Sequence, residues 1–184
     1  MLFRSRAPQV VQIGRYASVK NQLLTVRAFG QVLEQVADAR LVLYGVVEDP
    51  DYQRTVIGLV HELGIAHRVV VAGPRTDVAS VLSESNVFVM PSRSEGHSVA
   101  FLEALASGIP IVASRIPSFA FASGFPGVQL IDTDDVPAYA DAIVVALGQT
   151  RAQRSLAGLT LSDTAARYRA IAQQVSRRLA VSVR

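Results

Sequence analysis

Five short apolar runs recur along the chain, and each of them ends at a glycine, a proline or a serine. They are VVQIG at 10–14, ARLVLYG at 39–45, RVVVAG at 68–73, NVFVMP at 86–91 and IPIVAS at 109–114. All are rich in Val, Ile or Leu and lack the alternation of a half-exposed strand, which is typical of parallel strands covered on both faces. The weaker run VQLID at 128–132 predicts a sixth strand.

Between these runs the apolar positions change to the spacing of an amphipathic helix. The clearest case begins near residue 23 and carries Leu23, Val26, Phe29, Val32, Leu33 and Val36. Further helices are expected at about 52–63, 77–84, 98–107, 135–148, 151–158 and 160–180. Strands that alternate with helices predict an α/β fold with a doubly wound, Rossmann-like parallel sheet of about six strands, followed by C-terminal helices.

The composition is that of a globular protein with 184 residues, of which 50% are hydrophobic and 18% charged. The lack of cysteine excludes a disulfide framework, a thiolate metal site and a cysteine nucleophile. No run of residues has the composition of a signal peptide or the length of a membrane span. We expect a single cytoplasmic domain over 1–184, with an N-terminal linker or arm at 1–9 and C-terminal helices at 149–184.

The basic residues are unevenly distributed. The net charge is +3, and no acidic residue follows Asp163, whereas five arginines do: Arg167, Arg169, Arg177, Arg178 and Arg184. Such a segment either contacts phosphate-rich partners or the inner face of a membrane, or is an ordinary solvated helix face. We expect no nucleic-acid partner.

Two polar loops follow the first and the fourth predicted strands, and the carboxyl ends of such strands are where open parallel sheets bind ligands. In GRYASVK at 14–20, Gly14 allows a ligand to approach the backbone, and Arg15 and Lys20 could meet a pyrophosphate. The alternative is that both are plain surface residues. Lys20 is the only lysine in a chain with 17 arginines, which favours a specific role.

The second loop, SRSEGHS at 92–98, leads into a helix for which Ser98 is the expected N-cap. The free N–H groups of such a helix start attract anions. Glu95 precedes that start and Glu103 lies inside the helix. Their spacing alone favours an ordinary loop acid for Glu95 and a solvent-facing helix residue for Glu103. Later, the Asp-x-Asp in IDTDD at 131–135 is interpreted as an N-cap and acidic first turn and not as a metal site.

The ordered set of these segments resembles retaining GT-B-fold glycosyltransferases of family 4 (glycosyl transferases group 1), specifically their C-terminal domain, which binds the sugar donor. PSRSEGHSVAFLEALASGIPIVAS at 91–114 carries the signature of the family, with a Glu-Gly and a second Glu eight positions later. The segments IGRYASVKNQLLTVRAF, LGIAHRVVVAG and VLSESNVFVMPS fit the stretches before it. The resemblance covers about residues 10 to 148.

The resemblance implies that the site holds a nucleotide-sugar, UDP- or GDP-linked, without a metal or another cofactor. Arg15 and Lys20 would neutralise the diphosphate, helped by the backbone N–H groups of His97, Ser98 and Val99. Glu103 would accept hydrogen bonds from the ribose, and Glu95 from the donor sugar, so that both carboxylates lie away from the phosphates. The implied catalytic residues are Arg15, Lys20 and Glu95, and the implied substrate-binding set adds Gly14, Gly96, His97, Ser98, Val99 and Glu103.

The chain also departs from the family. It has His97-Ser98 where a second glycine is usual, and RIPSFAFASG after the last motif strand where a glycine-rich stretch with a glutamate is common. Only one of the two GT-B lobes is present, so we expect a hexosyltransferase of polysaccharide or glycolipid biosynthesis that is inactive without an N-terminal acceptor domain or partner chain. The alternatives are a non-catalytic nucleotide-sugar-binding or interaction module and a sugar-nucleotide epimerase of the same architecture.

Overall fold

The computed structural model describes residues 7–155 and, beyond them, residues 158, 162, 163, 165, 166, 169, 170 and 173. By its internal contacts the chain divides into two compact units, Met1–Gln153 and Arg154–Arg184. In the second unit, residues 162, 163, 165, 166, 169, 170 and 173 are helical. Of the arginines that predicted a membrane or phosphate contact, only Arg169 lies within the described residues, and it is exposed.

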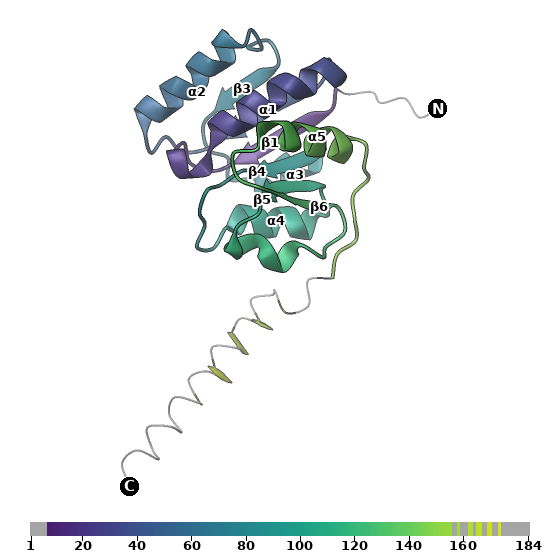
Figure 1. Cartoon of the computed structure of the whole chain (residues 1–184). Coiled ribbons are helices and arrows are strands. Elements are labelled where there is room, and N and C mark those ends of the chain that lie inside the picture. Colours follow the sequence, from purple (N-terminus) through teal and green to yellow (C-terminus); the bar gives the residue numbers. More distant parts are fainter. Residues whose placement is uncertain are drawn as a thin grey trace. The chain divides into compact units, whose positions relative to one another are not determined.

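The first unit is built on one six-stranded parallel sheet (Figure 1). Its strands are β1 (Gln9–Ile13), β2 (Arg40–Tyr44), β3 (Val69–Ala72), β4 (Val87–Met90), β5 (Ile111–Ser114) and β6 (Val128–Ile131). They lie in the order β3-β2-β1-β4-β5-β6, and every neighbouring pair is parallel. This is the doubly wound order, in which the chain changes direction across the sheet between β1 and β4. The predicted fold class is confirmed.

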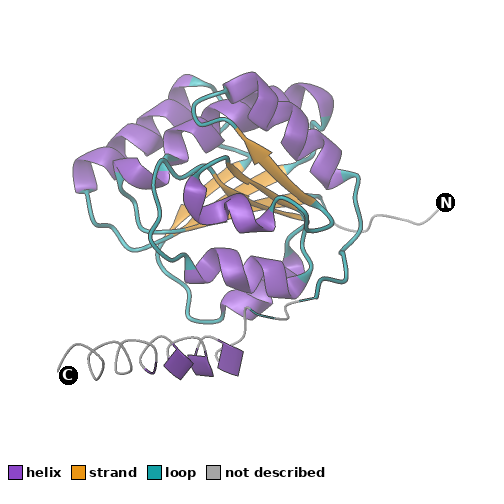
Figure 2. Cartoon of the chain, turned by 60° about the horizontal axis from the view of Figure 1, so that its bottom comes forward, coloured by secondary structure: helices purple, strands orange, loops and turns teal. Residues whose placement is uncertain are grey.

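Helices cover both faces of the sheet, as Figure 2 shows. They are α1 (Gln22–Gln35), α2 (Pro50–Glu62), α3 (Val78–Glu84), α4 (Val99–Ser107) and α5 (Val136–Leu147), with the short 3₁₀ helices η1 (Ser18–Lys20) and η2 (Pro117–Ala122). Helix α1 packs against α2 and α5, and α3 packs against α4. The sequence predicted each α-helix to within two residues, but not the two 3₁₀ helices.

The helix ends follow from local sequence. Asp49 caps α2 by accepting hydrogen bonds from the N–H groups of Asp51 and Tyr52, each at 3.0 Å, and Pro50 fits the first turn because that position needs no N–H donor. Ser98 caps α4, whose other end is closed by Gly108 in a left-handed conformation. The expected N-cap role of Ser98 is therefore confirmed.

The core has two layers because alternate residues of each strand point to opposite faces. On the α1, α2 and α5 side, Val10, Leu41 and Val89 pack with helix residues such as Phe29 and Ile143. The intervening strand residues are buried as well: Val11, Val42, Phe88, Met90, Ile111 and Ala113. Both faces are apolar, which explains why the sequence runs showed no alternation.

The predicted chain ends differ from the structure in two places. Gln9 already belongs to β1, so the expected arm at 1–9 is shorter, and residues 1–6 lie outside the described residues. Residues 149–155 form no helix, contrary to the expected start of the C-terminal helices. This segment is bonded to other elements instead: Arg151 donates to the carbonyl oxygens of Leu82, Ser85 and Ser107, and Ala152 N–H donates to Gly108 C=O at 2.8 Å. Among the residues that the structure describes, no helix combines the length and apolar character needed to span a bilayer.

Candidate functional site

A cleft of about 260 Å³ opens at the carboxyl ends of β1 and β4, where the order of the sheet reverses. We call it the β1/β4 cleft. It is lined by Ile13, Gly14, Arg15, Lys20, Met90, Glu95, His97, Ser98, Val99 and Ala100. The structure thus brings together most of the site residues predicted from the sequence. Two of the predicted residues, Gly96 and Glu103, are not part of its lining.

The loop after β1 is fixed to the neighbouring loops by backbone hydrogen bonds. Tyr16 N–H donates to Val46 C=O at 2.8 Å, and Asp49 N–H donates to Tyr16 C=O at 3.0 Å. The Tyr16 side chain is fully buried, and its hydroxyl lies 2.8 Å from the carbonyl oxygens of both Leu43 and Ala72. Burial raises the pKa of Tyr16 to about 12. Tyr16 therefore anchors the loop to the ends of β2 and β3.

The backbone at Gly45 packs closely against the backbone at Gly14. A Cβ atom added to Gly45, the residue after β2, would overlap the carbonyl oxygen of Gly14. A Cβ atom added to Gly14 would instead touch the aliphatic part of the Lys20 side chain, at 3.6 Å. Gly45 was not predicted as a site residue, although it ends an apolar run in the sequence. Glycine is needed at position 45 because any larger residue would displace the loop after β1.

Lys20 and Glu95 form an ion pair in the wall of the cleft, which we call the inner pair. Lys20 Nζ lies 2.5 Å from Glu95 Oε1, and the two side chains are only 15% and 6% exposed. The same carboxylate oxygen accepts a hydrogen bond of 2.7 Å from the hydroxyl of Ser92, a fully buried residue. Ser118 of η2 donates to the backbone carbonyl of Glu95. Glu95 is thus held at both its side chain and its backbone.

The backbone of Lys20 is positioned by a buried polar network. Gln12 of β1 donates from Nε2 to Lys20 C=O at 2.8 Å and accepts at Oε1 from the hydroxyl of Thr25 at 2.7 Å. Gln12 and Thr25 are almost fully buried, and both polar ends of the Gln12 amide are satisfied. Gln12 was not predicted as a site residue, although a glutamine in the middle of an otherwise apolar strand is the signal that could have revealed it.

Arg15 forms a second ion pair at the rim of the cleft, the outer pair, with Glu48 in the loop between β2 and α2. These side chains are 53% and 47% exposed, far more than those of the inner pair. Glu48 was not predicted, but it follows β2 and therefore lies at the same edge of the sheet as Arg15.

The two ion pairs change one expectation from the sequence. We expected both glutamates to lie at the ends of the ligand, away from the phosphates that Lys20 would neutralise, yet Glu95 bonds to Lys20 directly. The physical reason is that an ammonium group as buried as that of Lys20 needs a charged partner. The inner pair nevertheless leaves hydrogen-bonding capacity free, because Lys20 has three N–H donors and Glu95 has a second oxygen, Oε2.

The start of α4 presents backbone donors to the same cleft. Within the described part of the chain, the N–H groups of His97, Ser98 and Val99 have no protein acceptor. The Ser98 hydroxyl accepts from Phe101 N–H at 3.3 Å, which fixes the first turn. His97 and Val99 are exposed, as is Gly96 beside them. The predicted anion site therefore has free N–H groups at the expected place.

Glu103 lies four residues after Val99 in α4, and hence on the same face of the helix, one turn farther along. It is exposed, and no ion pair involves it among the described residues. The structure thus places Glu103 beyond the cleft wall that Val99 forms. Its role toward a ribose stays a prediction.

The acidic cluster before α5 has structural partners. Asp135 caps the helix by accepting from Ala138 N–H at 3.0 Å, as predicted, but the first turn contains no acidic residue. Asp134 accepts from Arg93 at 3.1 Å, and this bond holds the pKa of its carboxyl below the usual range. Asp132 pairs with Arg115 at 2.9 Å. In the described part of the chain, no three His, Asp or Glu side chains are grouped as metal ligands would be.

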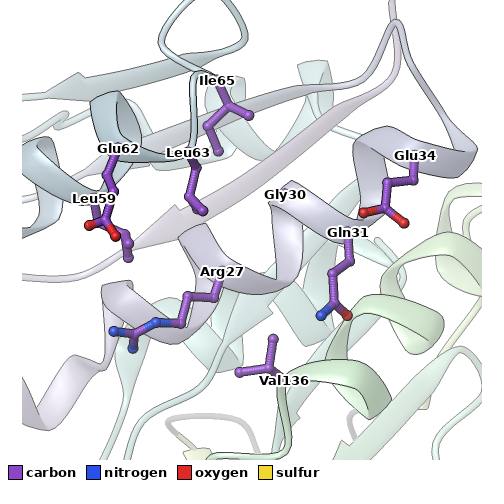
Figure 3. A pocket seen from close by; sticks show the side chains of 9 residues that line it. All are labelled: Arg27, Gly30, Gln31, Glu34, Leu59, Glu62, Leu63, Ile65 and Val136. Carbon is purple, nitrogen blue, oxygen red and sulfur yellow. The ribbon is translucent and has the colours of Figure 1, made fainter.

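A larger cleft of about 480 Å³ lies elsewhere, between α1, the end of α2 and the first residue of α5 (Figure 3). Its lining includes the charged side chains of Arg27, Glu34 and Glu62 beside Leu63. It contains none of the residues predicted from the sequence and none of the loops at the carboxyl ends of the strands. Size alone therefore does not identify the candidate site.

Comparison with known proteins agrees with the fold. Residues 7–149 match the family described as glycosyl transferases group 1. The chain is 33% identical over 156 residues to D-inositol 3-phosphate glycosyltransferase of Corynebacterium diphtheriae, which covers 80% of this chain and 36% of that protein. The chain thus spans about a third of the length of this relative.

Solved structures give the same result. Sucrose-phosphate synthase of Thermosynechococcus elongatus has 29% identity and a TM-score of 0.67, over 78% of this chain and 37% of that one. The C-terminal domain of a glycosyl transferase group 1 family protein of Francisella tularensis has 17% identity and a TM-score of 0.69, over 78% of this chain and 77% of that one. The α/β sheet matches one lobe of such GT-B glycosyltransferases. Because the family match extends over 7–149, the chain belongs to the glycosyl transferases group 1 family.

Proposed function

We propose that this chain is the domain of a retaining glycosyltransferase that binds a nucleoside diphosphate sugar and supplies the sugar for transfer to an acceptor. The observation that carries the proposal is the β1/β4 cleft, where two cations, a buried carboxylate and the free N–H groups at the start of α4 converge. Cations and free N–H groups suit a diphosphate, and a carboxylate oxygen suits a sugar hydroxyl.

Each residue has a distinct task in this proposal. Lys20 and the N–H groups of Ser98 and Val99 bind the diphosphate from the cleft wall, and Arg15 binds it from the rim. Glu95, through Oε2, accepts a hydrogen bond from the sugar. Glu103 accepts from the ribose hydroxyls, which places the nucleoside along the exposed face of α4 beyond Val99.

The same cations would assist the reaction. When the bond between the sugar and the phosphate breaks, negative charge grows on the departing nucleoside diphosphate. Lys20 is held in place by Gln12 and Glu95 before the reaction begins, so little reorganisation is needed to stabilise that charge. We propose that this stabilisation requires no metal ion.

The identity of the chain as one lobe of a larger assembly is part of the proposal. Support comes from the share of each relative that is covered, which is 36% for the full-length Corynebacterium enzyme and 77% for the isolated Francisella domain. A sugar acceptor would then be bound by a second lobe or a partner chain. Accordingly, this chain alone should bind the sugar donor but transfer little sugar.

Calorimetry of the purified 184-residue chain tests the proposal. We expect saturable binding of UDP or GDP that is unchanged by EDTA. Glu103→Ala should weaken diphosphate binding by about 1–3 kcal/mol, which is the usual cost of losing a hydrogen bond to a charged group. Glu34→Ala, an exposed glutamate on α1, is the matched control and should have no effect. Absence of binding to either diphosphate, or binding that requires a metal ion, would contradict the proposal.

A further inference from the structure

A second buried glutamine lies beneath the loop that carries Arg15. Gln22 is the first residue of α1 and is only 1% exposed. Its Nε2 atom donates to Arg15 C=O at 2.9 Å and lies 3.3 Å from Gly14 C=O. Its Oε1 atom is buried and has no protein partner among the described residues. Gln22 therefore uses one end of its amide to hold two consecutive peptide groups and leaves the other end unpaired.

This arrangement is unfavourable for stability alone, because a buried polar atom without a partner loses its hydration. The contrast with Gln12, whose amide is satisfied at both ends, shows that the fold can accommodate a buried glutamine without this cost.

The orientation of the Gly14–Arg15 peptide shows what Gln22 achieves. The Gly14 carbonyl faces Gln22 and abuts Gly45, and none of the described peptide bonds is cis. In a trans peptide the N–H group points opposite to the carbonyl, so Arg15 N–H points away from Gln22 and Gly45. Among the described residues this N–H has no acceptor. Gly14 and Arg15 both line the β1/β4 cleft.

We propose that Gln22 is a positioning residue, which fixes these two peptides so that the backbone N–H of Arg15 donates a hydrogen bond to the diphosphate. The proposal rests on the proposed function and adds a binding group that does not depend on the Arg15 side chain. It also explains why a polar residue stands here. An apolar residue would remove the unpaired oxygen but would leave both carbonyls free to turn.

The test measures ligand affinity and the backbone amide signal of Arg15 in the 184-residue chain. UDP, GDP and the corresponding nucleosides are titrated by ¹⁵N-resolved NMR. In the wild type, the Arg15 amide should shift downfield with the diphosphate and stay in place with the nucleoside. Gln22→Met, which keeps the length but lacks the N–H donor, should abolish this shift and lower diphosphate affinity about tenfold, the equivalent of roughly one hydrogen bond. Nucleoside affinity should not change.

Gln31→Met is the matched control, because Gln31 is exposed on the same helix. It should preserve both the amide shift and the affinity. If the wild type binds neither diphosphate, the proposed function and this inference fall together. If it binds and Gln22→Met matches it in affinity and in the Arg15 shift, the positioning role alone is wrong. Should Gln22→Met not fold, an Arg15 amide that does not respond to diphosphate in the wild type would overturn the inference.

Discussion

The inner pair and the outer pair of the β1/β4 cleft contain the same charges in different surroundings. Lys20 and Glu95 are 15% and 6% exposed, and hydrogen bonds from Gln12 and Ser92 hold them. Arg15 and Glu48 are about half exposed, and Glu48 lies in a loop between two elements. An exposed ion pair contributes little to stability, whereas a buried charge that loses its partner is costly.

Under the proposed function, the same difference gives the two cations separate roles. Separating Lys20 from Glu95 would cost much free energy, so Lys20 should serve as the fixed positive charge of the proposed diphosphate site. Arg15 can exchange Glu48 for a phosphate at little cost, since water already screens that pair. The cleft therefore combines one preorganised cation with one that is available to an incoming ligand.

The largest expected effect comes from removing one member of the inner pair. Glu95→Ala leaves the Lys20 ammonium buried without a counter-charge, and we expect a loss of about 3 kcal/mol or more in the free energy of unfolding. Glu48→Ala, the corresponding change in the outer pair, should cost less than about 1 kcal/mol. Urea denaturation of both variants measures the difference. Equal losses would show that burial does not distinguish the pairs.

A somewhat smaller effect is expected from the backbone contact beneath the outer pair. Gly45→Ala places a Cβ atom against the Gly14 carbonyl, so the loop that carries Arg15 must move; we expect a loss of about 1–3 kcal/mol in stability. Gly73→Ala is the matched control, because Gly73 follows β3 as Gly45 follows β2, yet a Cβ there meets nothing within 4 Å. If Gly45→Ala unfolds at the same temperature as Gly73→Ala, the backbone contact between residues 45 and 14 is not tight.

Much of the fold, and the elements that carry the cleft residues, could be predicted from the sequence. The strands and helices were predictable because apolar periodicity records burial. The candidate site could be predicted because parallel strands bring their carboxyl ends to one edge. Arg15, Lys20 and Glu95 belong to loops after β1 and β4, the two strands at the switch point. Their convergence therefore follows from topology.

The partners of these residues could not be predicted in the same way. Glu48 is 33 positions from Arg15 and Glu95 is 75 from Lys20, and no local pattern specifies such pairings. The 3₁₀ helix η2 was missed because it has too few residues to show a period. Its position depends on a distant contact, in which Phe119 stacks on Phe101 of α4 with ring centroids 4.2 Å apart.

An intermediate effect concerns Tyr16, which anchors the loop after β1. Tyr16→Phe leaves the carbonyls of Leu43 and Ala72 without the hydroxyl, and should lower the free energy of unfolding by about 1–3 kcal/mol at pH 7. Burial raises the pKa of Tyr16 to about 12, above its unfolded value of about 10. The stabilising contribution is therefore complete below pH 10 and is lost as the pH rises through 12.

The measurement is the difference in urea stability between wild type and Tyr16→Phe at several pH values from 7 to 12. The difference should be constant up to about pH 10 and should narrow above it. A gap that widens with pH would mean that the ionised phenol is favoured in the folded protein, which would contradict its burial.

The smallest expected effect tests whether Arg15 exchanges partners. Glu48→Gln removes the charge that competes with a phosphate for Arg15 but keeps the shape of the side chain. We expect diphosphate affinity to rise by about two- to fivefold, since an exposed ion pair is worth less than about 1 kcal/mol. Because screening weakens exposed charges most, the gain should be larger at low salt.

Glu34→Gln, on the exposed side of α1, is the control that removes one negative charge elsewhere. Calorimetry with UDP and GDP at two salt concentrations measures the affinities. If both glutamine variants give the same gain, only the overall charge matters. If Glu48→Gln binds more weakly than wild type, Glu48 holds Arg15 in place for the ligand and does not compete with it.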